Sequence, residues 1–193
     1  MSSTTLRDVV GLDQTPGTLA DATLILVDYQ NTYTEGVMEL EGWRPAVDNA
    51  ATLLERARAA GTPVLHIVDR GYDLTSEAGQ IIPALKPAPG EKVIEKSFPN
   101  GFQDTTLAEE VEKAGRKNVI VAGFMTHMCT LATTQGAFVN GNHATVVADA
   151  SATRPLPLNG RPDGVSARQL HESALATIQD LYGVVVPTQK SLG

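Results

Sequence analysis

Short apolar runs along the chain alternate with segments whose apolar positions recur at helical spacing. Six runs rich in Val, Ile and Leu are typical of strands buried in a parallel sheet, at residues 23–28, 63–68, 92–96, 117–122, 143–148 and 184–186. Between them, the helical pattern predicts helices at residues 45–60, 104–114, 126–140 and 165–182. This alternation predicts a single-domain, Rossmann-like three-layer α/β/α fold with a mostly parallel sheet of about six strands.

Turn and capping residues bound these predicted elements. Asp104 is expected to cap the start of its helix, while Gly61 and Gly183 are expected to end the helices before them. The segment 151–164 is rich in proline and glycine and is predicted to be a loop.

The chain divides into a short arm and one domain. Residues 1–21 are polar and contain Pro16 and Gly17, which predicts an arm lying over the surface or over a neighbouring subunit. Residues 22–193 contain no repeat or linker and are predicted to form the functional domain.

Composition narrows the class of partner. The net charge is −7 without a cluster of Lys or Arg, which argues against nucleic acid or an anionic membrane. No run approaches the roughly 18 apolar residues of a membrane span, and Cys129, as the single cysteine, excludes an internal disulfide. We therefore expect a cytoplasmic protein that acts on a small molecule and forms a homo-oligomer.

Three residues with chemical potential follow predicted parallel strands. Asp28 follows the first strand, Lys96 ends the third, and Cys129 comes just after the fourth. Such positions converge at the edge where open α/β sheets bind ligands. Near a helix start the Cys129 thiol is expected to tend toward thiolate, with Asp28 taking its proton and Lys96 holding the resulting anion.

Each of these residues also has a purely structural interpretation. Asp28 could order the loop that follows it, Lys96 could be a solvated surface lysine, and Cys129 could be a small core residue. A thiol redox sensor or a small-molecule binding protein on the same fold is the alternative function. Without a second cysteine, a sensor would need glutathione or another subunit to resolve its oxidised form.

Three ordered motifs give the chain a family resemblance. They read LILVDYQNTYTEG at 24–36, EKSFPNGFQDTTL at 95–107 and VAGFMTHMCT at 121–130. From about residue 22 to residue 187 the sequence resembles the isochorismatase-like cysteine hydrolases, a superfamily that includes nicotinamidases and N-carbamoyl-amide hydrolases. The resemblance implies a catalytic triad of Asp28, Lys96 and Cys129. It also implies a cis peptide between Phe124 and Met125, and an oxyanion hole formed by the backbone N–H groups of Met125 and Cys129.

Departures from the family pattern narrow the expected reaction. Metal-dependent nicotinamidases carry an Asp-x-His pair, whereas here Asp69 is present but Gly71 stands where the histidine would be. We therefore expect no metal and no other cofactor, which disfavours nicotinamidase itself. Isochorismate-cleaving members lack the cysteine, so the presence of Cys129 implies acyl transfer. The expected reaction is hydrolysis of a C–N bond in a small amide or ureido substrate through a thioester on Cys129.

Aromatic and apolar residues within the motifs are candidates for the walls of a substrate pocket. The candidates are Tyr33, Phe98, Phe102, Phe124 and Met125. Gln30 is expected to support the site through hydrogen bonds.

The histidines are assigned to structure or interfaces. His127 precedes Cys129 by two residues, and on a helix these positions point about 200° apart, which argues against a Cys-His pair. His127 is instead expected to line the pocket or an interface. His66, within a predicted strand, and His143 and His171 are expected to be structural or interfacial.

Overall fold

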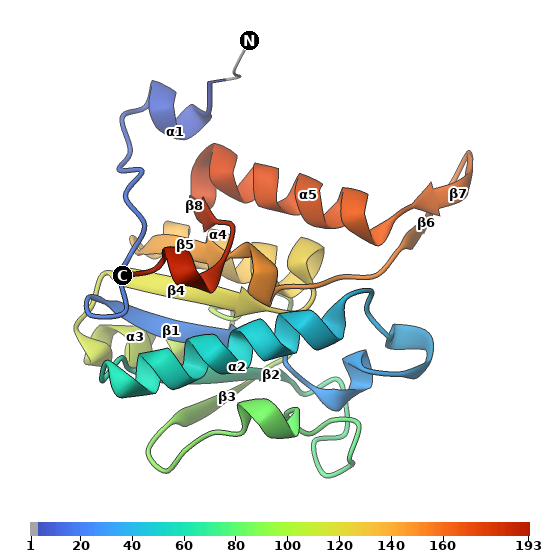
Figure 1. Cartoon of the computed structure of the whole chain (residues 1–193), viewed down its shortest axis with the longest axis horizontal. Coiled ribbons are helices and arrows are strands. Elements are labelled where there is room, and N and C mark those ends of the chain that lie inside the picture. Colours follow the sequence, from blue (N-terminus) through green and yellow to red (C-terminus); the bar gives the residue numbers. More distant parts are fainter. Residues whose placement is uncertain (1–3) are drawn as a thin grey trace.

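A computed structural model describes residues 4–193 and places six strands in one sheet (Figure 1). The strands are β1 (Ala22–Val27), β2 (Val64–Asp69), β3 (Lys92–Lys96), β4 (Asn118–Gly123), β5 (His143–Val147) and β8 (Gly183–Val186). Their order is β3-β2-β1-β4-β5-β8, and every neighbouring pair is parallel. The predicted three-layer α/β fold with a parallel six-stranded sheet is confirmed.

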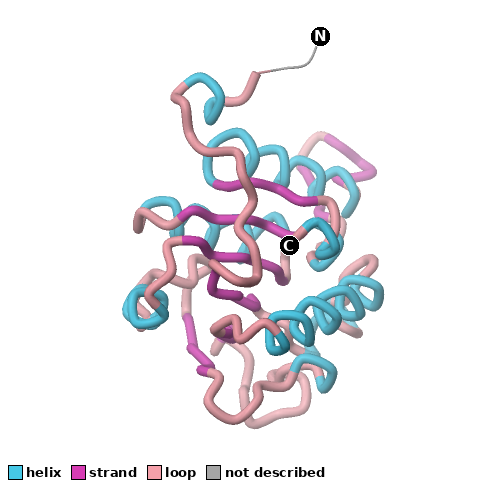
Figure 2. Tube along the Cα trace, turned by 60° about the vertical axis from the view of Figure 1, so that its left-hand side comes forward, coloured by secondary structure: helices cyan, strands magenta, loops and turns pink. Residues whose placement is uncertain are grey.

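Helices cover both faces of this sheet (Figure 2). They are α2 (Trp43–Ala59), α3 (Leu107–Ala114), α4 (Leu131–Val139) and α5 (Ala167–Thr177), whereas the short helix α1 (Leu6–Val9) packs against residues 178–182. In the central strand β1, Leu24 and Leu26 join the apolar cluster that includes α2. Ile25 and Val27 join the cluster that includes residues of α3 and α4. Alternate residues of β1 therefore serve two cores, which explains why the strand is apolar at four consecutive positions from Leu24 to Val27.

The start of α3 differs from the prediction. Asp104 was expected to be the N-cap, but its φ is +54°, and the N-cap is Thr106, two residues later. The chain takes a left-handed turn at Asp104, a conformation that Asp tolerates better than most residues. The helix therefore begins at Leu107.

The segment predicted to be a loop before α5 contains a β-hairpin. Strands β6 (Leu156–Leu158) and β7 (Arg161–Val165) pair antiparallel and project away from the sheet (Figure 1). The helix consequently starts at Ala167, after Ser166 closes a capping box with Gln169. Proline and glycine in the segment concealed the strands, because both residues usually mark loops.

Gly183 ends the helical segment, as predicted: the segment closes with a π-turn at Ile178–Tyr182 whose C-cap is Gly183. The same glycine also begins β8. A Cβ on Gly183 would lie 2.8 Å from the carbonyl oxygen of Ala144 in the neighbouring strand. The glycine therefore allows β8 to approach β5 closely.

The described part of the N-terminal arm packs along its own chain. The Leu6 N–H donates to Asp180 Oδ1 at 2.9 Å, and the Gly17 N–H donates to Thr145 Oγ1 at 2.8 Å. Arg7 is buried and donates to the carbonyl of Leu181 at 3.0 Å. None of the helices in residues 4–193 has the length and apolar character needed to cross a membrane.

Candidate active site

Three neighbouring strands end at one edge of the sheet and carry charged side chains there. Asp28 follows β1, Asp69 ends β2 and Lys96 ends β3. Asp69 and Lys96 are register partners, and β2 also pairs with β1. The three residues therefore occupy adjacent positions at the carboxyl edge, where ligands bind in open α/β sheets.

Asp28 turns the chain sharply as it leaves β1. Its φ is +51°, its N–H donates to the Ile67 carbonyl at 2.9 Å, and its side chain is fully buried. A buried carboxylate is costly unless it is paired, so its partner decides whether the site is stable.

Lys96 is that partner and lies at the centre of the cluster. Its Nζ is 2.7 Å from Asp28 Oδ2, 3.4 Å from Asp69 Oδ2 and 3.4 Å from Cys129 Sγ. Its side chain is fully buried although β3 is an edge strand, because it extends past β2 to reach Asp28. The structure thus brings together Asp28, Lys96 and Cys129, as the sequence analysis predicts.

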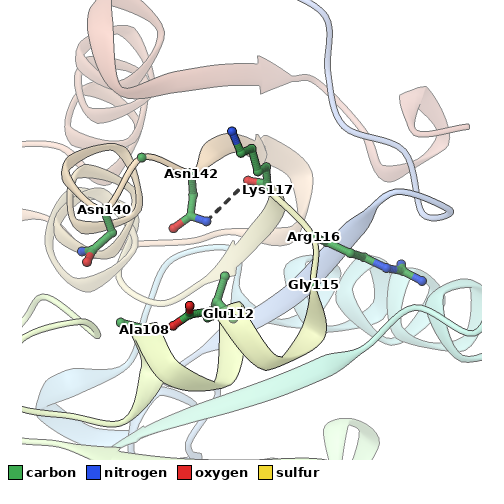
Figure 3. A pocket seen from close by; sticks show the side chains of 9 residues that line it. Ala108, Glu112, Gly115, Arg116, Lys117, Asn140 and Asn142 are labelled. Carbon is green, nitrogen blue, oxygen red and sulfur yellow. Dashed lines mark hydrogen bonds between the residues drawn. The ribbon is translucent and has the colours of Figure 1, made fainter.

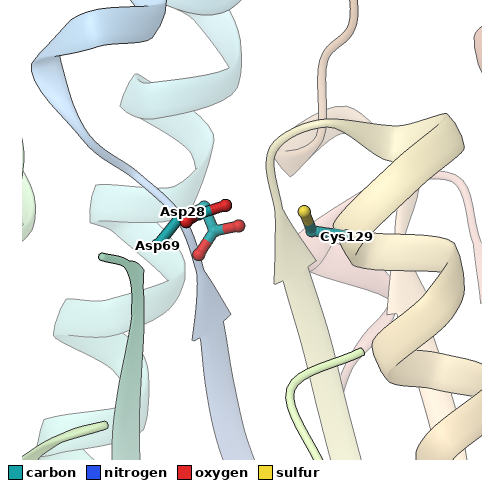
Figure 4. A group of neighbouring side chains, drawn as sticks. All are labelled: Asp28, Asp69 and Cys129. Atoms are coloured by element: carbon teal, nitrogen blue, oxygen red, sulfur yellow. The ribbon is translucent and has the colours of Figure 1, made fainter. Parts of the chain in front are cut away.

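The turn that carries Cys129 differs from the predicted first turn of an α-helix. Residues Thr126–Thr130 form a π-turn, in which the Thr130 N–H donates to the Met125 carbonyl at 3.2 Å, and α4 begins only at Leu131. The Phe124–Met125 peptide just before it is cis. In this turn Cys129 is buried, and its sulfur faces the carboxylates of Asp28 and Asp69 (Figure 4). π-turns are frequent at functional sites, and no residue pattern here distinguishes one from an α-helical turn.

Burial and charge set the protonation of the cluster. Burial raises the pKa of Asp28 to about 6, although the Lys96 ammonium opposes the shift. For Lys96, burial favours the neutral amine, but Asp28, Cys129 and Asp69 together hold its pKa above the ordinary value. At neutral pH the cluster therefore contains an ionised Asp28 and a charged Lys96.

The thiol itself does not tend toward thiolate, so that expectation is wrong. Burial raises the pKa of Cys129 to about 12, and the charge of Asp28 adds to the effect, while Lys96 opposes it. The sequence argument weighed the helix start and the lysine but not the desolvation of the sulfur. The resting site therefore holds a neutral thiol beside an ionised carboxylate that can accept its proton.

The two charges next to Cys129 should move its pKa in opposite directions. We expect Lys96→Met to raise the pKa of the thiol further and Asp28→Asn to lower it, because each removes a charge with the opposite effect. The rate of iodoacetamide alkylation between pH 6 and pH 11, followed by the mass of the peptide that contains Cys129, the single cysteine, measures this pKa shift. An ordinary pKa of about 8.5 that neither variant shifts would contradict this account.

Three of the predicted wall residues lie together beside the cluster. Tyr33, Phe124 and Met125 are all buried, and the rings of Tyr33 and Phe124 meet edge to face with centroids 6.0 Å apart. Burial, then a hydrogen bond with Tyr72, and then the charge of Asp28 raise the pKa of Tyr33. The sequence analysis did not include Tyr72, whose ring also packs against Tyr33 at 5.8 Å.

The other two aromatic candidates differ in burial. Phe102 is half-buried and packs against the apolar cluster that contains Cys129. Phe98 lies on the turn after β3 with 41% of its surface exposed. Phe102 therefore packs with the core that contains Cys129, whereas Phe98 is exposed to solvent.

Gln30 and Asp69 form a second layer of polar contacts. Gln30 is buried, accepts the Asp69 N–H at 2.8 Å, and donates to the carbonyls of Asp69 and Gly79 at 3.1 and 2.8 Å. Gln30 thus holds the end of β2 against the loop that follows it. The sequence analysis considered Asp69 only as part of a metal motif; its place after a buried strand, next to the strand of Asp28, was the available signal.

The cluster contains possible metal ligands but does not fit a metal ion. Asp28, Asp69 and Cys129 offer ligand atoms within 4.8 Å of one another. Lys96 Nζ, however, lies within 3.4 Å of all three residues and already supplies the positive charge that a metal would bring. Gly71, two residues after Asp69 at the end of β2, has no side chain to act as a further ligand.

The four histidines have partners outside the triad. His66 pairs with Glu91 at 2.8 Å, and His143 lies 2.7 Å from the carbonyl of Thr15. His171 Nδ1 lies 2.9 Å from Thr126 Oγ1, and His127 Nδ1 contacts Thr153 Oγ1. The last two pairs tie the nucleophile turn to α5 and to the segment after β5.

A cavity of about 390 Å³ lies at the opposite edge of the sheet (Figure 3). It is bounded by the C-terminal ends of α3 and α4 and by Lys117 and Asn142, which precede β4 and β5. Glu112 lines it from the last turns of α3. Because the triad lies at the carboxyl ends of the strands, this cavity is separate from it.

The chain is similar to a known protein family, to solved structures and to several named proteins. Residues 22–190 match the family described as the isochorismatase domain. The crystal structure of an isochorismatase from Pseudomonas putida KT2440 superposes with a TM-score of 0.94, at 39% identity, over 100% of both chains. The secreted isochorismatase effector Isc1 of Verticillium dahliae is 32% identical over 95% of this chain and 96% of its own. Nicotinamidase 3 of Arabidopsis thaliana is 30% identical over 88% of this chain and 86% of its own.

Proposed function

Because the chain belongs to the isochorismatase family of hydrolases, we propose that it hydrolyses a C–N bond in a small amide or ureido substrate through a thioester on Cys129. The observation that carries the proposal is the buried contact of Lys96 with both Asp28 and Cys129, at 2.7 and 3.4 Å. A buried base beside a thiol, held by a fixed cation, is the arrangement that nucleophilic catalysis requires.

The first half-reaction makes the thioester. Asp28 takes the proton of the Cys129 thiol as the sulfur attacks the carbonyl carbon, and a C–S bond forms while the carbonyl oxygen becomes an oxyanion. Asp28 then gives that proton to the leaving nitrogen as the C–N bond breaks. Lys96 stays protonated throughout and stabilises the negative charge that moves between carboxylate and sulfur.

The oxyanion needs donors while the tetrahedral intermediate exists. We assign this role to the backbone N–H groups of Met125, the residue before the π-turn, and Cys129, the fourth residue of that turn. Losing one such donor from an oxyanion hole costs about 3 kcal/mol of transition-state stabilisation.

The second half-reaction uses water. Asp28, ionised again, accepts a proton from a water molecule while the oxygen of that water attacks the thioester carbonyl. The C–S bond then breaks, the carboxylic or carbamic acid leaves, and the proton on Asp28 returns to the Cys129 sulfur. The resting site is restored without a metal or another cofactor.

Burial of the thiol argues against the redox-sensor alternative. A sensing cysteine is accessible and carries a lowered pKa. Cys129 is 4% exposed, and its pKa is raised by burial. A base that deprotonates the thiol during attack fits this state better than a standing thiolate does.

Trapping of the acyl-enzyme tests the proposal. We expect that incubation with a series of small primary amides and ureido compounds, followed by acid quenching, yields one acyl adduct detectable by intact mass. Hydroxylamine should remove the adduct, because it cleaves thioesters. Cys129→Ser, the near-isosteric control, should give no thioester and no turnover. Turnover that persists undiminished in Cys129→Ser would contradict the proposal.

A further inference from the structure

Asp69 is the solvent-facing member of the charged cluster. The side chains of Asp28 and Lys96 have no exposed surface, and Cys129 is 4% exposed, whereas 26% of the Asp69 side chain is exposed. Its carboxylate lies within 4.8 Å of the ligand atoms of Asp28 and Cys129, and Figure 4 shows the two carboxylates side by side. Asp69 is therefore the carboxylate of this cluster that a molecule arriving from solvent can contact.

The charge of Asp69 is only partly compensated. Lys96 Nζ lies 2.7 Å from Asp28 but 3.4 Å from Asp69 Oδ2, so the ammonium pairs mainly with Asp28. Asp69 Oδ1 accepts the Gly71 N–H at 2.8 Å. With a neutral thiol, two carboxylates and one ammonium leave a net negative charge at the site. Ionised carboxylates have about four acceptor positions, so Asp69 keeps some free.

A second observation points to a missing donor in the same place. Asp28 is fully buried, and its Oδ1 has no hydrogen-bond partner among residues 4–193. Buried carboxylate oxygens are normally satisfied, so an unpaired one at a reactive thiol indicates where a ligand group binds. The cluster thus offers acceptors and negative charge, whereas the Lys96 ammonium is already engaged with Asp28, Asp69 and Cys129.

We propose that Asp69 determines specificity at this site by binding a cationic or N–H-rich group of the substrate, such as an ammonium, a guanidinium or the NH₂ of a ureido group. Substrates that carry a carboxylate next to the scissile bond are correspondingly disfavoured. The inference deepens the proposed function, on which it rests for the identity of the ligand as a substrate. In this account Asp69 recognises the substrate, while Asp28 remains the proton acceptor.

Arg70 is the competing charge. It is exposed, and its Nε donates to Ser97 Oγ at 2.6 Å, which ties its side chain to the turn after β3. If Arg70 governed the approach to the thiol, anions would be preferred. The sign of the charge preference therefore distinguishes the two residues.

Charged thiol reagents measure that preference without a substrate. Aminoethyl methanethiosulfonate is a cation and sulfonatoethyl methanethiosulfonate an anion. Each is attacked by the thiolate at its sulfenyl sulfur, forming a disulfide and releasing methanesulfinate. We expect the ratio of cation to anion rates for Cys129, divided by the same ratio for 2-mercaptoethanol, to exceed one at pH 7.5. Asp69→Asn should lower the ratio by about tenfold, as expected for removal of one charge within about 5 Å.

The control variant changes the net charge of the protein by the same amount as Asp69→Asn, but at a position far from the site. Glu112→Gln removes one negative charge at the opposite edge of the sheet (Figure 3) and should leave the ratio unchanged. Asp69→Asn keeps the Oδ1 acceptor for the Gly71 N–H, so its fold should persist. A salt titration of the parent protein needs no variant. The ratio of cation to anion rates should fall toward one as NaCl rises from 20 mM to 500 mM.

Two results would overturn the inference: an anion preference in the parent protein, or an equal ratio in Asp69→Asn and Glu112→Gln. Neither result depends on hydrolysis. A charge preference controlled by Asp69 without any acyl adduct would instead show that the proposed function fails while the cation-selective site stands.

Discussion

Replacement of Lys96 by methionine is expected to lower the free energy of unfolding by about 3–5 kcal/mol, the typical cost of removing one partner from a buried ion pair. Asp28, with no exposed surface, would lose the ammonium that lies 2.7 Å from its Oδ2. Methionine fills a similar volume, so the loss reports charge rather than packing. Urea unfolding of the parent and the variant at pH 8 measures the difference.

The double variant Asp28→Asn/Lys96→Met is the matched control. It removes both charges and should recover a large part of the lost stability, because no uncompensated charge stays buried. Asparagine suits position 28, since it tolerates the left-handed conformation with φ of +51° better than most residues. At pH 5, below the pKa of about 6 for Asp28, the carboxyl is neutral and the cost of Lys96→Met should shrink. A loss under about 1 kcal/mol at pH 8 would show that the ion pair does not support the fold.

Asp28→Asn is expected to lower the rate of hydrolysis by about 10²- to 10⁴-fold, the usual contribution of a positioned acid–base group. The amide can neither take the thiol proton nor protonate the leaving nitrogen. Steady-state kinetics with the substrate that gives the acyl adduct measure the loss. A thermal unfolding curve checks that the variant is folded.

The pH profile separates loss of a base from loss of structure. In the parent protein, kcat/KM should fall about tenfold per pH unit below about pH 6, because Asp28 must be ionised to accept the proton and its pKa is raised to about 6. Asp28→Asn should lack this acid limb, since its amide does not titrate. An unchanged limb in the variant, or a rate within threefold of the parent, would remove Asp28 from the role of base.

Local patterning was sufficient to predict the sheet. Residues 24–27 are apolar at every position because alternate side chains of β1 enter two different cores. A parallel strand covered on both faces has this pattern, so the pattern indicates that both faces of the strand are buried. The hairpin at Leu156–Val165 was not predicted from the sequence. It projects from the sheet, so its residues are mostly exposed and burial imposes no periodic pattern on them.

The candidate site was predictable as a set of positions. Asp28, Lys96 and Cys129 each follow a strand in the sequence, and parallel strands bring their carboxyl ends to one edge. The family resemblance, which the isochorismatase-domain match confirms, named the same three residues. Asp69 was equally visible by position, but it was considered only for a metal that the site does not fit.

By itself, the sequence determined the layered fold, the edge at which the site lies and the chemical identity of its residues. Those properties follow from the spacing of apolar residues and from the order of strands and helices along the chain, both of which can be recognised in short stretches of sequence. Only the tertiary structure decided that Cys129 sits in a π-turn as a neutral thiol and that Lys96 crosses β2 to pair with Asp28. Desolvation and charge pairing act between residues far apart in the chain, so they arise only when the strands are assembled.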